Sequence, residues 1–269
     1  MDYLNKVHIG AVSYLNSKPL VYGLEGCRED IDITYDLPSE LADSLGSGEL
    51  DVALIPSFEY FRDPTYSIVS DVCVACEGPV WSVKLYSRKP LRQIQTLALD
   101  EGSRSSSALA QILLYERFGI KPTLQKLRVK DALQDVDADA YVVIGDRAMY
   151  PTGEVFVQQW DLGREWQKMT NLPFVFAMWV ARYGANLKEI DQILENCRQE
   201  GLKNIDKIIA QESPRLKIPP KKCESYFTKN LHFTLGKKEK ESLMLFYEYA
   251  LKMEFVTEGI ELNFYEPIS

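Results

Sequence analysis

The stretch VHIGAVSYLNSKPL (residues 7–20) changes character at its middle. Residues 7–12 form a mostly apolar run of the kind that builds a buried β-strand. The residues that follow include Ser, Tyr, Asn, Lys and Pro, which end a strand rather than continue it. In open α/β sheets, ligands bind just beyond the carboxyl ends of the strands. The stretch therefore predicts an α/β sheet with a candidate binding segment directly after its first strand.

The size and charge of the chain narrow the classes of protein to which it can belong. Its 269 residues suit two domains of ordinary size or one large α/β unit. The composition is 46% hydrophobic and 26% charged, which is typical of a globular protein with a core. A formal net charge of −8 gives no indication of a nucleic-acid or anionic-membrane partner. An anionic ligand would have to be held by local hydroxyl and N–H donors.

The lack of a recognisable targeting signal and the pattern of cysteines predict a cytoplasmic protein. The N-terminal MDYLNKVHIG lacks the basic and apolar segments of a secretory signal, and no run of 18 apolar residues predicts a membrane span. The five cysteines are scattered and odd in number, as expected for reduced thiols. Cys73 and Cys76 form a C-x-x-C inside a strand pattern without a second Cys or His pair, so we expect small apolar residues there rather than a zinc or redox site.

Strand patterns alternate with helical patterns along most of the chain. One helix is expected from Pro38 to Gly46 or Gly48, and another from the serines at 103–107 to Gly119. The C-terminal third is helical in pattern. This alternation implies parallel sheets covered by helices on both faces. The expected strands are residues 7–12, 32–37, 51–57, 66–76, 81–87, 96–100, 140–146 and 174–182.

The order of these elements predicts two lobes with a ligand cleft between them. The C-terminal helices have no long sheet of their own to cover, so we expect them to pack on the first block of strands. The first lobe would then be discontinuous, with residues 1–85 and 181–269, and the second lobe would be residues 86–180. The chain would cross between the lobes twice.

Four polar clusters each follow a predicted strand. They are residues 13–16, Pro56 with Ser57, the serines at 103–107, and Gly145 with Asp146. Alone, each has a simpler explanation: the serines can cap a helix, and Asp146 can be a turn residue. Together they predict one crevice, because the carboxyl ends of parallel strands share an edge. Hydroxyls and free N–H groups at a helix start suit a carboxylate or phosphate.

Most catalytic motifs are absent from the sequence. It contains two histidines: His8 lies within the first strand, where a packed role is expected, and His232 lies near the C-terminus. No H-x-x-x-H, Walker loop, G-x-G-x-x-G, G-x-S-x-G or S-x-x-K occurs, so metal, nucleotide and serine-nucleophile chemistry lack support. We expect no cofactor. The remaining candidate site consists of hydroxyls, an amide, backbone donors and one carboxylate.

Six stretches resemble, in order, the motifs of the chorismate dehydratases, enzymes of the futalosine route to menaquinone. They cover about residues 7 to 185: VSYLNSKPL, LADSLGSGELDVALIPSFEY, GPVWSVKLYS, LALDEGSRSSSAL, ADAYVVIGDRAM and WDLGREWQKMTNLPFVFAMWVAR. The resemblance implies the two-lobed fold of type II periplasmic binding proteins, with two crossovers. It also implies dehydration of chorismate to 3-[(1-carboxyvinyl)oxy]benzoate, with no metal or redox cofactor.

The resemblance also assigns roles to individual residues. The asparagine of the family's S-Y-L-N-x-x-P-L motif is Asn16, which we expect to be catalytic. Ser82 matches the S-V motif, and residues 103–106 match S-R-T-S with Ser105 in place of threonine. For Asp146, a turn role and a direct role both stay open. The expected substrate-binding residues are Tyr14, Ser57, Ser82, Ser103, Ser105, Ser106, Gly145 and Asp146.

The same reasoning predicts a mechanism and leaves two alternatives. No motif position offers a histidine base, and a carboxylate would repel the dianionic substrate, so we expect the enolpyruvyl carboxylate of chorismate to take the proton. One alternative is an anionic-solute-binding protein of the same fold. The other is the sister enzyme, 1,4-dihydroxy-6-naphthoate synthase, whose family has an S-P-C-P-N-D-type opening motif and a histidine base that this sequence lacks. Beyond the small molecule, the sequence identifies no protein partner.

Overall fold

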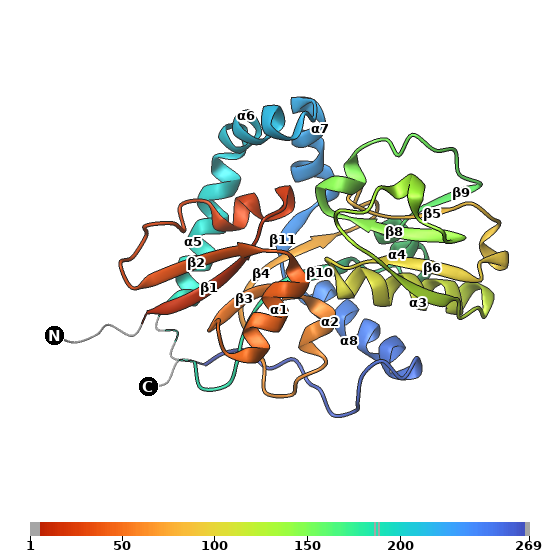
Figure 1. The fold of residues 1–269 in the computed structure, drawn as a ribbon. Helices are drawn as coiled ribbons and strands as arrows, with labels where there is room; N and C mark the ends of the chain where they lie inside the picture. Colours follow the sequence, from red (N-terminus) through yellow and green to blue (C-terminus); the bar gives the residue numbers. More distant parts are fainter. Residues whose placement is uncertain (1–5, 186, 188, 267–269) are drawn as a thin grey trace.

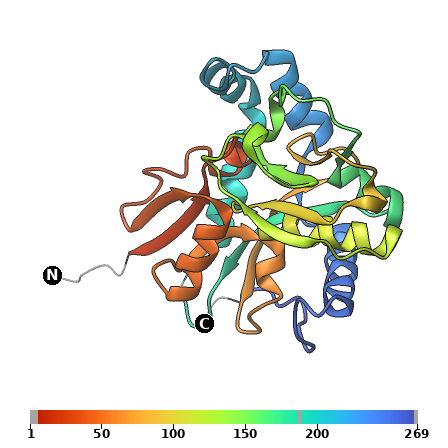
Figure 2. The same ribbon diagram turned by 45° about the vertical axis from the view of Figure 1, so that its right-hand side comes forward.

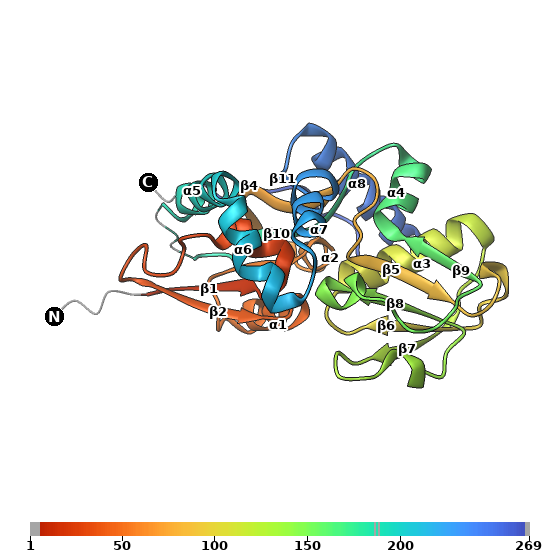
Figure 3. The same ribbon diagram turned by 90° about the horizontal axis from the view of Figure 1, so that it is seen from above.

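The protein is built around two β-sheets that lie side by side (Figures 1 and 2). The computed structural model describes residues 6–185, 187 and 189–266. Within this part of the chain the first sheet has six strands and the second has five. Figure 3 shows the helices arranged around both sheets, with the C-terminal helix α8 beside the boundary between them. The expected α/β architecture with two sheets is confirmed.

The first sheet has the strand order β11-β4-β10-β3-β1-β2. Its two central strands, β3 and β10, are buried at every position, which explains their unbroken apolar sequences. Strand β1 pairs in parallel with β2 and β3, whereas β10 runs antiparallel to β3 and β4. The strands are β1 (Val7–Val12), β2 (Ile31–Asp36), β3 (Val52–Pro56), β4 (Ser67–Cys76), β10 (Phe174–Ala181) and β11 (His232–Thr234).

The second sheet has the strand order β7-β6-β8-β5-β9. Strand β8, AYVVI, lies at the centre of this sheet and is buried at every position. Strand β6 pairs in parallel with β7 and β8, whereas β5 runs antiparallel to β8 and β9. The strands are β5 (Val83–Ser87), β6 (Thr96–Asp100), β7 (Thr123–Leu127), β8 (Ala140–Ile144) and β9 (Gln158–Asp161).

The helices connect and cover these strands. Helix α1 ends at Ser47 with Gly48 as its cap, and α3 starts after Ser103 and ends before Gly119, as expected. The helices are α1 (Pro38–Ser47), α2 (Ser57–Tyr60), α3 (Arg104–Phe118), α4 (Leu162–Thr170), α5 (Ile190–Lys203), α6 (Ile205–Leu216), α7 (Pro220–Ser225) and α8 (Lys237–Lys252). The 3₁₀ segments are η1 (Leu15–Val21), η2 (Leu91–Gln93), η3 (Leu133–Asp135) and η4 (Gly145–Met149), and η5 (Tyr226–Asn230) is a π-helical turn.

The expectation of purely parallel sheets is wrong. Both sheets are mixed. In the first sheet, the chain leaves after Cys76 and returns at Phe174 in the opposite direction, and in the second sheet β5 runs antiparallel to both of its neighbours. Three strands also escaped the sequence analysis: β7, β9 and β11. Strand β7 is an exposed edge strand, and β9 and β11 are only 4 and 3 residues long, so none has a clear hydrophobic pattern.

The chain passes between the two sheets at other residues than the expected lobe boundaries, 85/86 and 180/181. The change from first to second sheet lies between Cys76 and Val83, and the return lies between Asp161 and Phe174. Strand β5 therefore belongs to the second sheet and β10 to the first. The sequence did not indicate this, because both are apolar strands that would fit either core. We keep the two-lobed division as a proposal, with these crossovers as its limits.

Helix α5 lies against η1, the segment that follows the first strand. An added Cβ at Gly201 would lie 2.0 Å from the carbonyl oxygen of Pro19 and 2.7 Å from its carbonyl carbon. No side chain fits at that distance, so the two elements approach this closely only because residue 201 is glycine.

Replacing Gly201 with alanine should therefore destabilise the protein and displace η1. Forced overpacking costs about 1–3 kcal/mol, which exceeds the gain of up to about 1 kcal/mol from helix propensity. Urea denaturation of the wild type and the variant measures the difference in unfolding free energy. Gly46→Ala in α1 is the control, because its new Cβ would come no closer than 3.4 Å to Tyr66 Oη. Equal stability of both variants would contradict the packing described here.

Candidate active site

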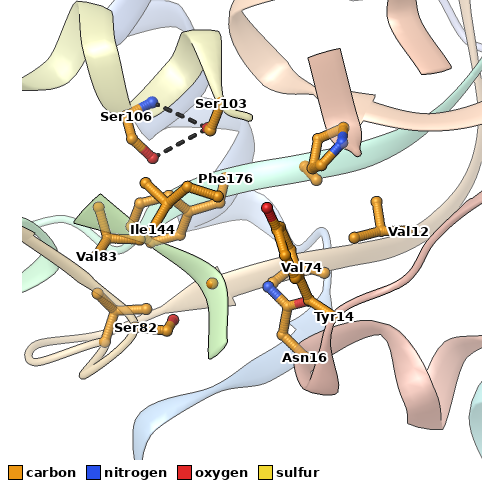
Figure 4. Close-up of a pocket in the computed structure, with 14 residues that line it drawn as sticks. Val12, Tyr14, Asn16, Val74, Ser82, Val83, Ser103, Ser106, Ile144 and Phe176 are labelled. Atoms are coloured by element: carbon orange, nitrogen blue, oxygen red, sulfur yellow. Dashed lines mark hydrogen bonds between the residues drawn. The ribbon is translucent and has the colours of Figure 1, made fainter. Parts of the chain in front are cut away.

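A pocket lies where the two sheets meet, lined by residues of both. Figure 4 shows Tyr14 and Asn16 on one side, Ser103 and Ser106 opposite them, and Ser82 on a third side. Gly145 also lines the pocket. These six residues come from four separate parts of the chain. Apolar side chains form the rest of the wall, among them Val12, Val74, Val80, Ile144 and Phe176.

Asn16 lies in the first turn of η1, two residues after Tyr14. Its Oδ1 atom is buried and has no hydrogen-bond partner in the described part of the protein. A buried amide oxygen is costly to leave unpaired, so this atom is available for a ligand. The residue expected to be catalytic therefore lies in the pocket with unused hydrogen-bonding capacity.

The Tyr14 ring packs closely against Gly145, which follows β8. An added Cβ at residue 145 would lie 2.8 Å from Tyr14 Cζ, and the backbone there has a φ of +64°, which favours glycine. Burial raises the pKa of Tyr14, and the nearby carboxylates of Asp100 and Asp146 raise it further. The phenol therefore keeps its proton at neutral pH and can donate a hydrogen bond.

The start of α3 supplies hydroxyls to the pocket. Ser103 caps the helix by accepting a hydrogen bond from Ser106 N at 3.3 Å, and the two hydroxyl oxygens are 3.0 Å apart. One hydroxyl proton of this pair therefore remains free for a ligand. The Arg104 side chain is directed elsewhere, because it forms ion pairs with Asp43 of α1 and Glu59 of α2.

Ser57 and Ser105 do not line the pocket. Ser57 Oγ donates to the carbonyl of Val175 at 2.6 Å and lies 3.2 Å from Ser105 Oγ, which accepts from Phe58 N at 3.0 Å. Both serines are fully buried. The structure places them as a link between α2 of the first sheet and α3 of the second. A substrate-binding role for them stays a prediction that the geometry does not favour.

Asp146 also lies outside the pocket lining. Its Oδ1 atom accepts a hydrogen bond at 2.9 Å from the backbone N–H of Leu15, the residue before Asn16. Burial raises the pKa of Asp146, and this bond partly counteracts the shift. Asp146 thus joins the end of β8 to the segment that carries Asn16, so it is more than a local turn residue. A direct role in substrate binding stays a prediction.

Asp100 does not line the pocket but holds the backbone of residues beside it. Its carboxylate accepts hydrogen bonds from Gly102 N at 3.0 Å and Ile144 N at 3.2 Å, so it joins the ends of β6 and β8. Burial raises the pKa of Asp100 to about 6, although the two N–H groups lower it in part. The sequence LALDEG contains this residue, but only the tertiary structure reveals its two partners.

Ser82 is held by two residues that the sequence analysis did not identify. Tyr226, from the C-terminal third, is 2.8 Å from Ser82 Oγ. Asp161 accepts hydrogen bonds from Val80 N and Trp81 N, at 2.9 and 2.7 Å. The motif WDLG contains Asp161, and its position before a helix could have signalled a cap, whereas nothing in the helical pattern around Tyr226 marks it.

The pocket combines a largely apolar wall with a few polar groups and carries no formal charge of its own. Among the described residues, none that lines it is Asp, Glu, His, Lys or Arg. Elsewhere in the described part of the chain, no three or more His, Cys, Asp or Glu side chains are grouped as a metal site. The lining offers hydroxyls, one amide, N–H groups at a helix start and apolar walls. This combination can bind an organic anion that has both carboxylate and ring surfaces.

Comparison with known proteins now places the chain in a family. The family described as "Menaquinone biosynthesis" matches residues 7–252. A chorismate dehydratase of Thermus thermophilus is 32% identical over 270 residues, covering 92% of this chain and 96% of that protein. The chain belongs to the menaquinone biosynthesis family. The resemblance seen in the sequence motifs is confirmed.

Solved structures similar to this family member share its fold at low sequence identity. A protein of Archaeoglobus fulgidus superposes with a TM-score of 0.73 at 14% identity, covering 94% of this chain and all of that one. The periplasmic aliphatic sulphonate binding protein of Escherichia coli gives a TM-score of 0.60 at 14% identity over 96% of each chain. These likenesses confirm a periplasmic-binding-protein-like fold. Among the described residues, no helix is long and apolar enough to cross a bilayer.

Asp100→Asn should change how stability depends on pH. Between the ordinary pKa of 3.8 and the raised value of about 6, the folded protein binds a proton on Asp100 that the unfolded chain has lost. The contribution of Asp100 to the free energy of unfolding therefore falls as the pH rises through this interval, by up to about 3 kcal/mol. Asparagine cannot titrate, so the variant lacks this fall.

Chemical denaturation near pH 4 and near pH 7 tests this expectation. The stability of the wild type relative to the variant should decrease toward the higher pH. A difference that stays constant between the two pH values would show that Asp100 ionises normally in the folded protein.

Proposed function

We propose that this protein is a chorismate dehydratase, a carbon–oxygen lyase that forms 3-[(1-carboxyvinyl)oxy]benzoate for menaquinone biosynthesis. The observation that carries the proposal is the match over nearly the whole chain to the Thermus thermophilus chorismate dehydratase, within a family of menaquinone biosynthesis. The pocket supports it, because its uncharged donors and apolar walls suit a ring that carries carboxylates.

The reaction removes the elements of water from neighbouring ring carbons. The carbon that carries the enolpyruvyl ether loses a proton, the adjacent carbon loses its hydroxyl, and the ring becomes aromatic. Aromatisation drives the reaction, so the protein mainly has to orient the substrate and stabilise the charge that develops. Hydroxyl and amide donors at fixed positions are adequate for that task.

The substrate's own enolpyruvyl carboxylate acts as the base in this proposal. A general base must come within about 2.6–3.2 Å of its proton, or reach it through one water. Among the described pocket residues there is no His, Asp or Glu, whereas the enolpyruvyl carboxylate is tethered next to that proton. Asp100 and Asp146 lie behind the lining and already accept backbone N–H groups.

Asn16 is assigned the catalytic role because its amide both donates and accepts hydrogen bonds. Its Oδ1 atom is buried and has no partner in the described structure, and Asn16 lines the pocket. The amide would orient the departing hydroxyl or the enolpyruvyl carboxylate. Ser103, Ser106 and the first N–H groups of α3 would hold a carboxylate, aided by the positive end of the helix dipole.

A solute-binding role and the sister 1,4-dihydroxy-6-naphthoate synthase remain the alternatives. The structural likeness to a periplasmic binding protein, at 14% identity, concerns the fold alone. No specific feature of the pocket favours either alternative. We further propose a cytoplasmic location, because all five cysteines are free thiols, as in a reducing compartment.

Asn16→Asp should abolish turnover of chorismate without unfolding the protein. Aspartate is nearly isosteric but replaces an N–H donor with a negative charge that repels the dianion. Chorismate consumption and product formation are followed by chromatography, and folding by thermal melting. Asn196→Asp, the same change at an exposed position of α5, is the matched control and should keep wild-type activity. Wild-type protein that does not consume chorismate would refute the proposed function, and an active Asn16→Asp variant would refute the role of Asn16.

A chorismate analogue with its enolpyruvyl carboxylate blocked as an amide tests the identity of the base. The analogue should bind, although more weakly, and should not lose water, because the proposed base is no longer ionised. Competition against chorismate measures its binding, and product analysis measures elimination. Rapid elimination from the bound analogue would mean that a protein group removes the proton.

A further inference from the structure

The hydroxyl of Ser82 is paired with a buried tyrosine from a distant part of the chain. Tyr226 Oη and Ser82 Oγ are 2.8 Å apart, although the two residues are 144 positions apart in sequence. Tyr226 is fully buried and Ser82 is 1% exposed. Ser82 lines the pocket, whereas Tyr226 lies behind it. The phenol therefore contacts the pocket only through the serine.

The direction of this hydrogen bond follows from the surroundings of the phenol. Among the described residues, Ser82 Oγ is the one hydrogen-bond partner of Tyr226 Oη. A buried O–H that donates to nothing is costly, so the phenol proton goes to Ser82. Burial also raises the pKa of Tyr226, which keeps that proton in place at neutral pH. Ser82 Oγ is then occupied as an acceptor, and its own proton is left for the pocket.

We propose that Tyr226 is a positioning residue that makes Ser82 a hydrogen-bond donor toward an anionic oxygen of the substrate. The inference rests on the proposed function, since it assigns the serine a carboxylate oxygen of the bound dianion. Hydrogen bonds in a chain polarise one another, so the phenol also strengthens the serine as a donor. Without the phenol, the Ser82 hydroxyl can rotate and either donate or accept.

Hydrogen bonds also fix the backbone just before Ser82. Trp81 has a φ of +66°, an uncommon conformation for a bulky side chain. Asp161 maintains it by accepting the N–H groups of Val80 and Trp81 on its two carboxylate oxygens. The Trp81 ring meets the Tyr226 ring edge to face at 5.5 Å. The hydroxyl of Ser82 and the backbone before it are thus each held by a group that does not line the pocket.

Tyr226 begins the π-helical turn η5, next to the short helix α7. Such turns are rare and are often found at functional sites. Here the turn brings a C-terminal side chain behind a loop that links the two sheets. The C-terminal segment, which the sequence pattern describes only as helical, therefore contributes to the pocket through this one hydroxyl.

Tyr226→Phe tests the proposal, because it keeps the ring contact with Trp81 and removes only the hydroxyl. Steady-state kinetics with chorismate should show KM raised about three- to tenfold, the usual effect of one hydrogen bond, with kcat changed less than about twofold. A purely structural role would instead lower the melting temperature and leave KM unchanged.

Ser82→Ala and the double variant complete the test as a thermodynamic cycle. If Tyr226 acts through Ser82, then Tyr226→Phe should not raise KM further once Ser82 is alanine. An equal increase in both backgrounds, or no increase in the single variant, would overturn the proposal. If Tyr226→Phe alone fails to fold, the comparison of Ser82→Ala with the double variant still decides, because a difference in KM between them contradicts the mechanism.

Tyr141→Phe is the matched control. Tyr141 is equally buried, but its hydroxyl has no partner in the described structure, so KM should stay at the wild-type value. Wild-type protein that is inactive on chorismate would refute the proposed function itself. Wild-type activity with an unaltered KM in Tyr226→Phe would refute only the role of Tyr226.

Discussion

The loops that line the pocket depend on aspartates that accept backbone N–H groups. Backbone N–H groups that are shielded from water destabilise the fold unless they find acceptors. Asp100 accepts from residues 102 and 144, Asp146 accepts from Leu15, and Asp161 accepts from residues 80, 81 and 164. The three carboxylates thereby join strand ends that are far apart in sequence, and they fix where the pocket residues lie.

This arrangement explains how an acidic protein can present an uncharged pocket. Each carboxylate is directed at the backbone rather than at the cavity, and burial raises the pKa of all three. The groups that line the pocket are hydroxyls, an amide and the start of α3. Dipoles of this kind, fixed in advance, can stabilise an anion without a positively charged side chain. The overall charge of −8 is therefore no obstacle to an anionic ligand.

The strands with strong apolar patterns could be found from the sequence, because burial on both faces leaves an unbroken hydrophobic run. Strands β3, β8 and β10 are examples. Their sheet and direction could not be found in the same way. The sequence of β10 fits either core, and only the return of the chain from the second sheet makes it antiparallel to β3. Edge strands such as β7 have too little buried surface to leave a pattern.

For the site, resemblance to the family singled out Ser82, and the sequence by itself determined the motif residues that follow the strands: Tyr14, Asn16, Ser103 and Ser106. All five line one pocket. Local patterns carry this information because a strand end, a helix cap and a polar turn are each defined by a few neighbouring residues. Only the tertiary structure decided that Ser57 and Ser105 bind each other and that Asp146 binds Leu15. It alone brought Tyr226 to Ser82. Those partners meet across two sheets, where packing sets the distances and no sequence pattern records them.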